Sequence, residues 1–257
     1  MICAGLDAGS RAIKVVLFDH AQSKLIGSGI SDQGVQQVQL AEALYDETLR
    51  QAGLTRADVG AVVATGYGRN RVKFARTTIT EITCHARGVH HLAPAARSII
   101  EIGGQDSKII RLEDGGRVRD FAMNDRCAAG TGRFLEMLAA RLQMDCSALG
   151  ALGRLSLKPA VISNTCVVFA ETEIIGLLAE GAAPADIVAG VQQAIALRIL
   201  AMAGRELEPP VFFTGGVALQ AGMLRALEEV VGCAIQVAPQ PQFTGALGAA
   251  ILAGRHA

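Results

Sequence analysis

The chain has no tryptophan, only two tyrosines, and equal numbers of acidic and basic residues, 24 of each, among its 257 residues. Zero net charge, with no long block of like charge, excludes a large electrostatic surface for nucleic acid or an acidic membrane. No apolar stretch reaches the roughly 18 residues that a membrane-spanning helix needs. We therefore expect no nucleic-acid partner and no membrane, and any phosphate contacts should be with a small molecule.

The first residues, Met1 to Asp7, lack a basic segment followed by an apolar one, so we expect a cytoplasmic location. In that reducing compartment, six scattered cysteines are expected to be buried, redox-active or metal-binding rather than paired in disulfides. A chain of this length suits one large domain or two compact ones.

Two segments of the sequence resemble each other. Asp7-Ala8-Gly9 followed by Lys14 matches Glu101-Ile102-Gly103 followed by Lys108, with acid, glycine and lysine at the same offsets. Each pattern predicts a strand, a tight glycine turn and a second strand, which together form a β-hairpin. The repeat predicts two homologous lobes: residues 1–97 with a C-terminal helix at about 245–257, and residues 98–244.

Apolar residues recur at helical spacing between and after these hairpins. Helices are expected at residues 38–52, 134–142, 171–180, 187–203, 223–231 and 245–253, with short strands at 61–64 and 211–213. Strands mixed with amphipathic helices indicate an α/β fold. No Pro- or Ser-rich linker separates the halves, so the boundary near Arg97 follows from the repeat alone.

Three glycine turns predict phosphate contacts: Asp7-Ala8-Gly9-Ser10, Gly103-Gly104-Gln105-Asp106 and Thr214-Gly215-Gly216-Val217. Glycine lets backbone amides approach phosphate oxygens, and a carboxylate beside the turn can hold Mg²⁺ through its waters. Two such hairpins could clamp a triphosphate. Rossmann and Walker sites are excluded, because no GxGxxG follows a strand and no GxxxxGK[ST] occurs.

Two lone cysteines are each expected at the start of a helix, Cys127 at one interrupted by glycines and Cys166 at another. Exposed amides and the positive dipole end favour a thiolate at such a position. Neither has a CxxC partner, so one chain offers too few closely spaced thiolates for a four-ligand site, whereas a twofold dimer offers four. The other interpretation is a small buried hydrophobe, as for most free cysteines. Arg126 and Arg133 flank Cys127 and either are solvated or face an acidic redox partner.

The remaining cysteines are expected to be structural. Cys84 lies beside His85, but adjacent side chains rarely converge on one ion, and no second cysteine is near. Cys3 and Cys233 are expected in the core, and Cys146 has no evident partner.

Together these patterns resemble the actin, hexokinase and heat-shock-chaperone ATPase superfamily, and within it the activators of 2-hydroxyacyl-CoA dehydratases and the ATP-binding subunits of benzoyl-CoA reductase. The similar stretches cover nearly the whole chain: residues 6–10, 64–69, 81–86, 102–108, 124–136, 166–171, 214–218 and 245–250. The resemblance implies a two-lobed, duplicated actin/hexokinase-like ATPase fold with ribonuclease H-like lobes.

The resemblance also implies ATP, Mg²⁺ and one [4Fe-4S] cluster per dimer as cofactors. Asp7 and Glu101 would hold hydrated magnesium, and Gln105 would orient the attacking water, since positioning supplies much of phosphoryl-transfer catalysis. Cys127 and Cys166 of both subunits would hold the cluster. The residues implied to line the nucleotide are Gly9, Ser10, Arg11, Ala12, Ile13, Lys14, Gly103, Gly104, Gln105, Gly215 and Gly216.

The implied function is ATP-driven electron transfer by a homodimer. Reduced ferredoxin or flavodoxin would supply one electron, and ATP hydrolysis would drive it onto a 2-hydroxyacyl-CoA dehydratase or a related CoA-ester reductase. The chain departs from the family pattern at Arg11, where threonine is usual, and at Gln220, where asparagine is common. These changes bear on a phosphate contact and on the nucleoside rim.

Three alternatives stay open. The chain could be a benzoyl-CoA reductase-type ATP-binding subunit, or a small-molecule kinase of the same fold with Asp106 as its base. It could also be a non-catalytic module that responds to ATP, in which the cysteines belong to the core.

Overall fold

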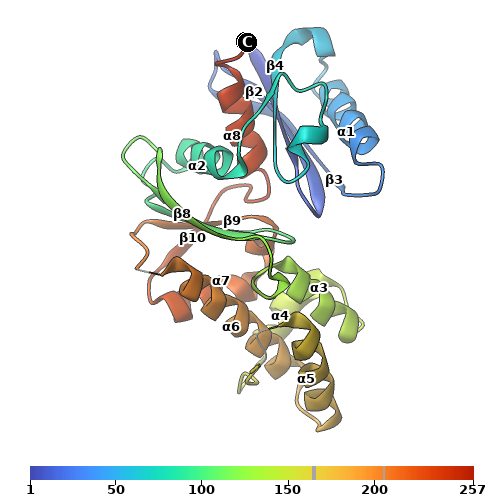
Figure 1. The fold of residues 1–257 in the computed structure, drawn as a ribbon, viewed down its shortest axis with the longest axis vertical. Helices are drawn as coiled ribbons and strands as arrows, with labels where there is room; N and C mark the ends of the chain where they lie inside the picture. The colour runs from blue at the N-terminus through green and yellow to red at the C-terminus, as the bar shows by residue number, and fades with distance from the viewer. Residues whose placement is uncertain (164–165, 205) are drawn as a thin grey trace. The chain divides into compact units, whose positions relative to one another are not determined.

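The computed structural model describes residues 1–163, 166–204 and 206–257 (Figure 1). The chain divides into two compact units. Unit 1 comprises Met1–Ala96, Leu112–Asp120 and Ala238–Ala257, and unit 2 comprises Arg97–Arg111 and Phe121–Val237. Within the described residues, two mixed five-stranded sheets with helices packed on them confirm the predicted α/β class.

The sheet of unit 1 has the strand order β3-β2-β1-β4-β5. Its strands are β1 (Ile2–Ala8), β2 (Ala12–Asp19), β3 (Lys24–Asp32), β4 (Val59–Thr65) and β5 (Thr77–Thr78). Strand β1 pairs antiparallel with β2, as the predicted hairpin requires, and parallel with β4. The predicted helix at 38–52 is α1 (Gln37–Gln51), which buries Ala41, Tyr45, Thr48 and Leu49. Short 3-10 turns η1 (Arg56–Asp58) and η2 (Arg69–Arg71) flank β4.

The C-terminal helix α8 (Thr244–Ala253), red in Figure 1, packs against β1, β2, β4 and α2 (Glu81–Leu92). Every residue of α8 is buried. A Cβ built on Gly5 of β1 would lie 2.0 Å from the Ala246 carbonyl oxygen, so the strand and the helix backbones are in direct contact. The small side chains of α8 permit this approach, which ties the end of the chain to the first strand.

The second sheet repeats the first, with the order β10-β9-β6-β7-β8. Its strands are β6 (Ser98–Ile102), β7 (Ser107–Leu112), β8 (Val118–Asn124), β9 (Val211–Thr214) and β10 (Ile235–Val237). As β1 does in unit 1, β6 pairs antiparallel with the next strand, β7, and parallel with a later strand, β9. The predicted second hairpin and the predicted duplication of the lobes are therefore confirmed.

Helices cover this sheet around a core that includes Ile100, Phe134, Ile195 and Phe213. They are η3 (Ala128–Gly130), α3 (Gly132–Arg141), η4 (Cys146–Ala148), α4 (Leu149–Gly153), α5 (Val167–Ala179), α6 (Pro184–Ala203), η5 (Gly216–Leu219) and α7 (Ala221–Val231). The four helices predicted in this half are present as α3, α5, α6 and α7. Helix α6 starts at Pro184, earlier than predicted, because proline is well suited to the first helical position.

The expectation that no segment could span a membrane is wrong on length and composition alone, because α6 is long and apolar enough. A core helix passes the same test. In α6, Ile187, Val191, Ile195 and Ile199 recur at helical spacing and are buried in the core of unit 2. The apolar character of α6 therefore follows from its packing in that core.

Candidate functional site

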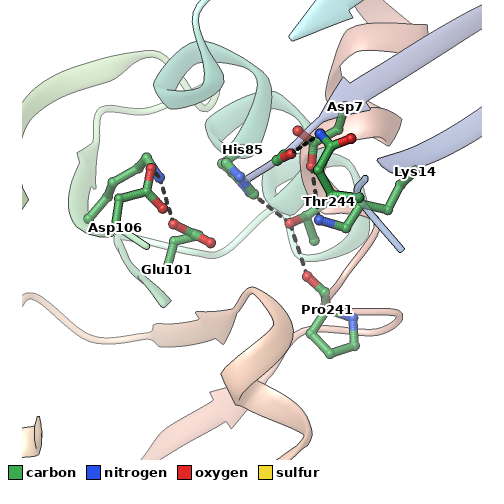
Figure 2. A network of polar contacts seen from close by, with 10 residues as sticks. Asp7, Lys14, His85, Glu101, Asp106, Pro241 and Thr244 are labelled. Carbon is green, nitrogen blue, oxygen red and sulfur yellow. Dashed lines mark hydrogen bonds and ion pairs between the residues drawn. The ribbon is translucent and has the colours of Figure 1, made fainter. Parts of the chain in front are cut away.

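In unit 1, an acidic residue is enclosed at the end of the first strand. Lys14 lies opposite Asp7 in the β1–β2 hairpin, and its Nζ is 3.4 Å from Asp7 Oδ2 (Figure 2). Thr65 lies opposite Asp7 on the parallel strand β4. Gly66 follows with φ +85°, and a Cβ there would lie 2.3 Å from Asp7 Oδ1. The Thr-Gly step after β4 therefore lies directly against this carboxylate.

The same arrangement recurs in unit 2. Lys108 lies opposite Glu101 in the β6–β7 hairpin, and Thr214 lies opposite Glu101 on the parallel strand β9. Gly215 follows with φ +91°, and a Cβ there would lie 2.3 Å from the Ile102 carbonyl oxygen and 2.7 Å from Glu101 Oε1. A glycine is needed here for both its backbone conformation and the lack of space. The sequence had shown the acid, glycine and lysine of the repeat, but the two threonines become equivalent only through strand pairing.

The lysines of the two hairpins differ in their surroundings. The Lys108 side chain is only 1% exposed, and its Nζ lies 2.8 Å from Glu101 Oε2 and 2.9 Å from Asp106 Oδ2. The Lys14 side chain is 16% exposed and makes the longer contact with Asp7. When ionised, two carboxylates around one ammonium carry one net negative charge, which suits a hydrated divalent cation.

The first glycine turn is held by the end of β3. The side-chain amide of Gln33 donates to the Gly9 carbonyl at 2.8 Å, and the Gln33 backbone N–H donates to the Arg11 carbonyl at 2.9 Å. Arg11 forms an ion pair with Asp32 at 3.0 Å. Ile13 is fully buried. Gln33 does not stand out in the sequence, because β3 carries glycines and polar residues and shows no clear strand pattern.

The second glycine turn is closed by a hydrogen bond from the Gly103 N–H to the Asp106 carbonyl at 2.9 Å, and Gln105 is exposed at its tip. Gln105 borders a cavity of about 630 Å³ within unit 2. The other lining residues are Asp125, Arg126, Ala128, Arg133, Glu136, Met137 and Val167. This cavity brings the second turn, the segment around Cys127 and the start of α5 to one place.

The arginines that flank Cys127 both form ion pairs in this cavity. Arg126 lies 3.8 Å from Asp125, and Arg133 lies 3.1 Å from Glu136. The Arg126 side chain is 95% exposed, so its pair with Asp125 is weak. Both guanidinium groups therefore lie beside a local carboxylate.

Cys127 lies at the start of a helical segment that is interrupted at its glycines, as expected. It is half-buried and precedes the 3-10 turn η3, after which Thr131 is extended and accepts a hydrogen bond from Arg133 N as the cap of α3. Asn124 fixes the Cys127 backbone, accepting from its N–H at 3.0 Å and donating to its carbonyl at 2.8 Å. The guanidinium of Arg198 is 3.9 Å from Cys127 Sγ.

Cys166 is exposed and caps the N-terminus of α5, as predicted. The two residues before it, 164 and 165, lie outside the described residues. Ala128 and Val167, the chain neighbours of the two cysteines, line the same cavity. Over the described residues, no group of three or more His, Cys, Asp or Glu side chains could hold a metal ion. Two thiols are half the number of ligands that a four-ligand site needs.

Cys84 lies where α2 crosses α8. A Cβ on Gly248 would lie 1.8 Å from the Cys84 carbonyl oxygen, and burial raises the pKa of the Cys84 thiol to about 12. The neighbouring His85 ring shares a hydrogen bond of 2.9 Å with Thr244 Oγ1, which also contacts the Pro241 carbonyl (Figure 2). These contacts fit the structural role expected of Cys84.

The three remaining cysteines are Cys3 and Cys233, which were both predicted to lie in the core, and Cys146. Cys3 is fully buried, and Cys233 is half-buried against the core of unit 2. Gln220 is the N-cap residue of α7, and its side-chain amide donates a hydrogen bond of 2.9 Å to the Cys146 carbonyl. The departure at Gln220 thus has a local packing role.

Comparisons with known proteins show which family the sequence of this chain matches. A family model described as the BadF/BadG/BcrA/BcrD ATPase family matches residues 4–253. A 2-hydroxyisocaproyl-CoA dehydratase activator of Clostridioides difficile is 43% identical, over 98% of this chain and 95% of that protein. One of the subunits of the benzoyl-CoA reductase of Thauera aromatica is 33% identical, over 97% of this chain and 92% of that protein.

Solved structures give the same result. The activator of the 2-hydroxyisocaproyl-CoA dehydratase from Clostridium difficile, with bound ADPNP, has a TM-score of 0.94 and 40% identity, covering 100% of this chain and 95% of that one. A ROK family glucokinase from Streptomyces griseus has a TM-score of 0.61 at 15% identity, covering 99% of this chain and 100% of that one. The second likeness shows the fold alone, and it confirms the predicted actin/hexokinase-like architecture.

Proposed function

We propose a function from one premise: the chain belongs to the BadF/BadG/BcrA/BcrD ATPase family. It is an ATP-dependent activator of a 2-hydroxyacyl-CoA dehydratase or of a related CoA-ester reductase, and it couples ATP hydrolysis to single-electron transfer. The observation that carries the proposal is the cavity of unit 2, which borders both the Gln105 turn and the segments of the two cysteines. In unit 2, the turn proposed to contact the nucleotide therefore lies beside the segments that carry the two cysteines proposed as cluster ligands.

We place the two ATPase lobes at residues 1–97 with the C-terminal helix at about 245–257, and at residues 98–244. These bounds differ from those of the two compact units at residues 112–120 and 238–244, which belong to unit 1. The first turn, Gly9 to Lys14, and the second turn, Gly103 to Gln105, each contact ATP phosphates, and Gly215 and Gly216 border the adenosine. The duplicated acid, lysine, threonine and glycine positions support this assignment, because each lobe presents the same backbone at the end of its first strand.

Asp7 and Glu101 would each offer a carboxylate to the water ligands of Mg²⁺, and Gln105 would orient the water that attacks the terminal phosphate. A side-chain amide is too weak a base to remove a proton from water. It can, however, hold a water molecule in a fixed position by accepting one hydrogen bond from it and donating another to it. The exposure of Gln105 at the tip of its turn supports this role. Asp106 is held by Lys108 at 2.9 Å, which fits a positioning role better than that of a free base.

The thiols of Cys127 and Cys166 fit an iron-sulfur cluster that two copies of the chain share, with two ligands from each copy. When bound, such a cluster stores and transfers single electrons. Asn124 fixes the backbone of one ligand, and the other ligand lies at the N-cap of α5. Val168 and Phe169, beside Cys166, are both exposed. These adjacent exposed apolar side chains support a homodimer, since such side chains can mark a protein–protein interface.

The activator receives its electron from ferredoxin or flavodoxin and works in the cytoplasm. The experiment mixes the anaerobically purified chain with ATP, Mg²⁺, a low-potential reductant and the dehydratase component of the Clostridioides difficile system. We expect dehydration of the 2-hydroxyacyl-CoA with ATP and none with ADPNP. ATP-dependent phosphorylation of a sugar without dehydratase activation would instead establish the kinase alternative.

A further inference from the structure

We infer that Thr131 and Gly132 form a link through which the second glycine turn positions the segment that carries Cys127. The inference rests on the proposed function and deepens it, because it names the residues that connect the nucleotide to the redox ligand. All of the contacts that support it lie within unit 2.

The first part of the link joins α3 to the glycine turn by its backbone. Gly132 N–H donates to the Gly103 carbonyl at 2.9 Å, and Arg133 N–H donates to the Gly104 carbonyl at 3.0 Å. These two N–H groups belong to the first turn of α3, where no intrahelical acceptor exists. The glycine turn therefore supplies the acceptors that complete the helix end, and a displacement of the turn must displace α3 or break both bonds.

The space around Gly132 is too small for a larger residue to lie there without displacing its neighbours. A Cβ would lie 3.1 Å from the Gly103 carbonyl oxygen, 3.4 Å from Gly104 Cα and 3.3 Å from Val217 Cγ2. Gly132 thus packs between the second and the third glycine turns. It lies where two turns that are proposed to contact ATP meet the start of one helix.

The second part of the link joins Gly132 to Cys127. The Thr131 hydroxyl donates to the Ala128 carbonyl at 2.7 Å and accepts from Arg133 N–H at 3.3 Å, so one buried side chain bridges η3 and α3. Asn124 then bonds both backbone groups of Cys127. Hydrogen bonds and single peptide bonds therefore connect Gly103 to Cys127.

A side contact supports the same path. A Cβ on Gly130 would lie 3.3 Å from Asn124 Nδ2 and 3.7 Å from Ser107 Oγ, and Ser107 is the residue at which β7 leaves the glycine turn. Both ends of the second turn thus contact the segment from Asn124 to Arg133. Because packed protein segments move as units, the turn and this segment should share one response to nucleotide.

The test is hydrogen exchange of the full chain, with and without ADPNP and Mg²⁺, resolved at Gly103, Cys127 and Gly132. With nucleotide at a hundred times its Kd, amides that open only in the nucleotide-free form slow by up to about 100-fold. We expect slowing of this order at Gly103 and at both other amides in the wild type. Thr131→Val should keep the slowing at Gly103 and reduce that at Cys127 to less than about twofold.

Two further variants locate the break. Thr131→Ser keeps the hydroxyl and should restore the response at Cys127, which a loss of general stability would not do. Asn124→Ala cuts the link at its far end, so the response should persist at Gly132 and disappear at Cys127. If wild-type Gly103 slows and Cys127 does not, the inference is wrong. If Gly103 itself does not slow, the proposed nucleotide site is wrong.

Discussion

Asp7 and Glu101 occupy the same position in the two units, each opposite a lysine across a hairpin and opposite a threonine on a parallel strand. The two positions differ in charge balance and burial. Asp7 contacts Lys14 at 3.4 Å, whereas Glu101 and Asp106 together enclose the buried Lys108.

The burial of Lys108 leads to a prediction about stability. Lys108→Met leaves two carboxylates without their cation and should lower the free energy of unfolding by about 3–5 kcal/mol. The matched variant Lys14→Met breaks one longer, more exposed contact and should cost about 1 kcal/mol or less. Urea unfolding measures both, and equal losses would show that the two hairpins are held alike.

Gly215 should tolerate alanine poorly. Alanine at φ +91° strains the backbone, and its Cβ would overlap the Ile102 carbonyl, so the loss should be about 3 kcal/mol or more. Gly232 is the control, because it also has a positive φ, +78°, but nothing lies within 4 Å of its Cβ position. Gly232→Ala should cost about 1–2 kcal/mol. If both variants unfold at the same urea concentration, close packing at Gly215 contributes nothing.

Gln105→Ala should slow ATP hydrolysis about 100-fold, because a poorly oriented water rarely reaches the in-line position. ATP binding should change by less than about twofold, since the backbone of the turn remains. Gln51→Ala is the control, because Gln51 is exposed on α1 and bonds Glu47. Steady-state hydrolysis and equilibrium ATP binding, measured separately, decide the matter. Unchanged turnover would remove Gln105 from the mechanism.

Burial of Cys84 predicts a loss of stability in alkali. The thiol pKa is about 12 in the folded chain against an ordinary value of 9.0, so its contribution is complete below pH 9.0. As the pH rises from 9.0 towards 12, the unfolded chain ionises first, and each pH unit costs about 1.4 kcal/mol. Cys84→Ala should lack this component. Urea unfolding at pH 8 and pH 10 gives the free energy of unfolding of the wild type and of Cys84→Ala. Equal losses of this free energy between the two pH values would contradict the prediction.

The hairpins could be predicted from the sequence because acid, glycine and lysine repeat at fixed offsets, and these residues determine a local structure. The equivalence of Thr65 and Thr214 could not, since it depends on parallel pairing between strands far apart in sequence. Likewise, no pattern shows that Lys108 is buried between two carboxylates.

The glycine-interrupted helix expected to start at Cys127 shows what the pattern leaves open, namely where the regular helix begins. Apolar spacing predicted α3 well, but the run from Cys127 to Gly132 contains two glycines and a threonine, and these residues favour turns and caps over helix interiors. Thr131 becomes the cap of α3, and Cys127 is the N-cap of the preceding 3-10 turn. The spacing of apolar residues predicts that a helix exists, but it does not show where a capping side chain starts that helix.

The central claim is that two copies of the chain share one iron-sulfur cluster through Cys127 and Cys166. The most direct measurement is iron, sulfide and native mass after anaerobic purification of the wild type, Cys127→Ala, Cys166→Ala and the control Cys146→Ala. We predict about four irons per dimer in the wild type and the control, and none in the other two, which should still bind ATP. A metal-free wild-type monomer, or full iron in either cysteine variant, would contradict the account.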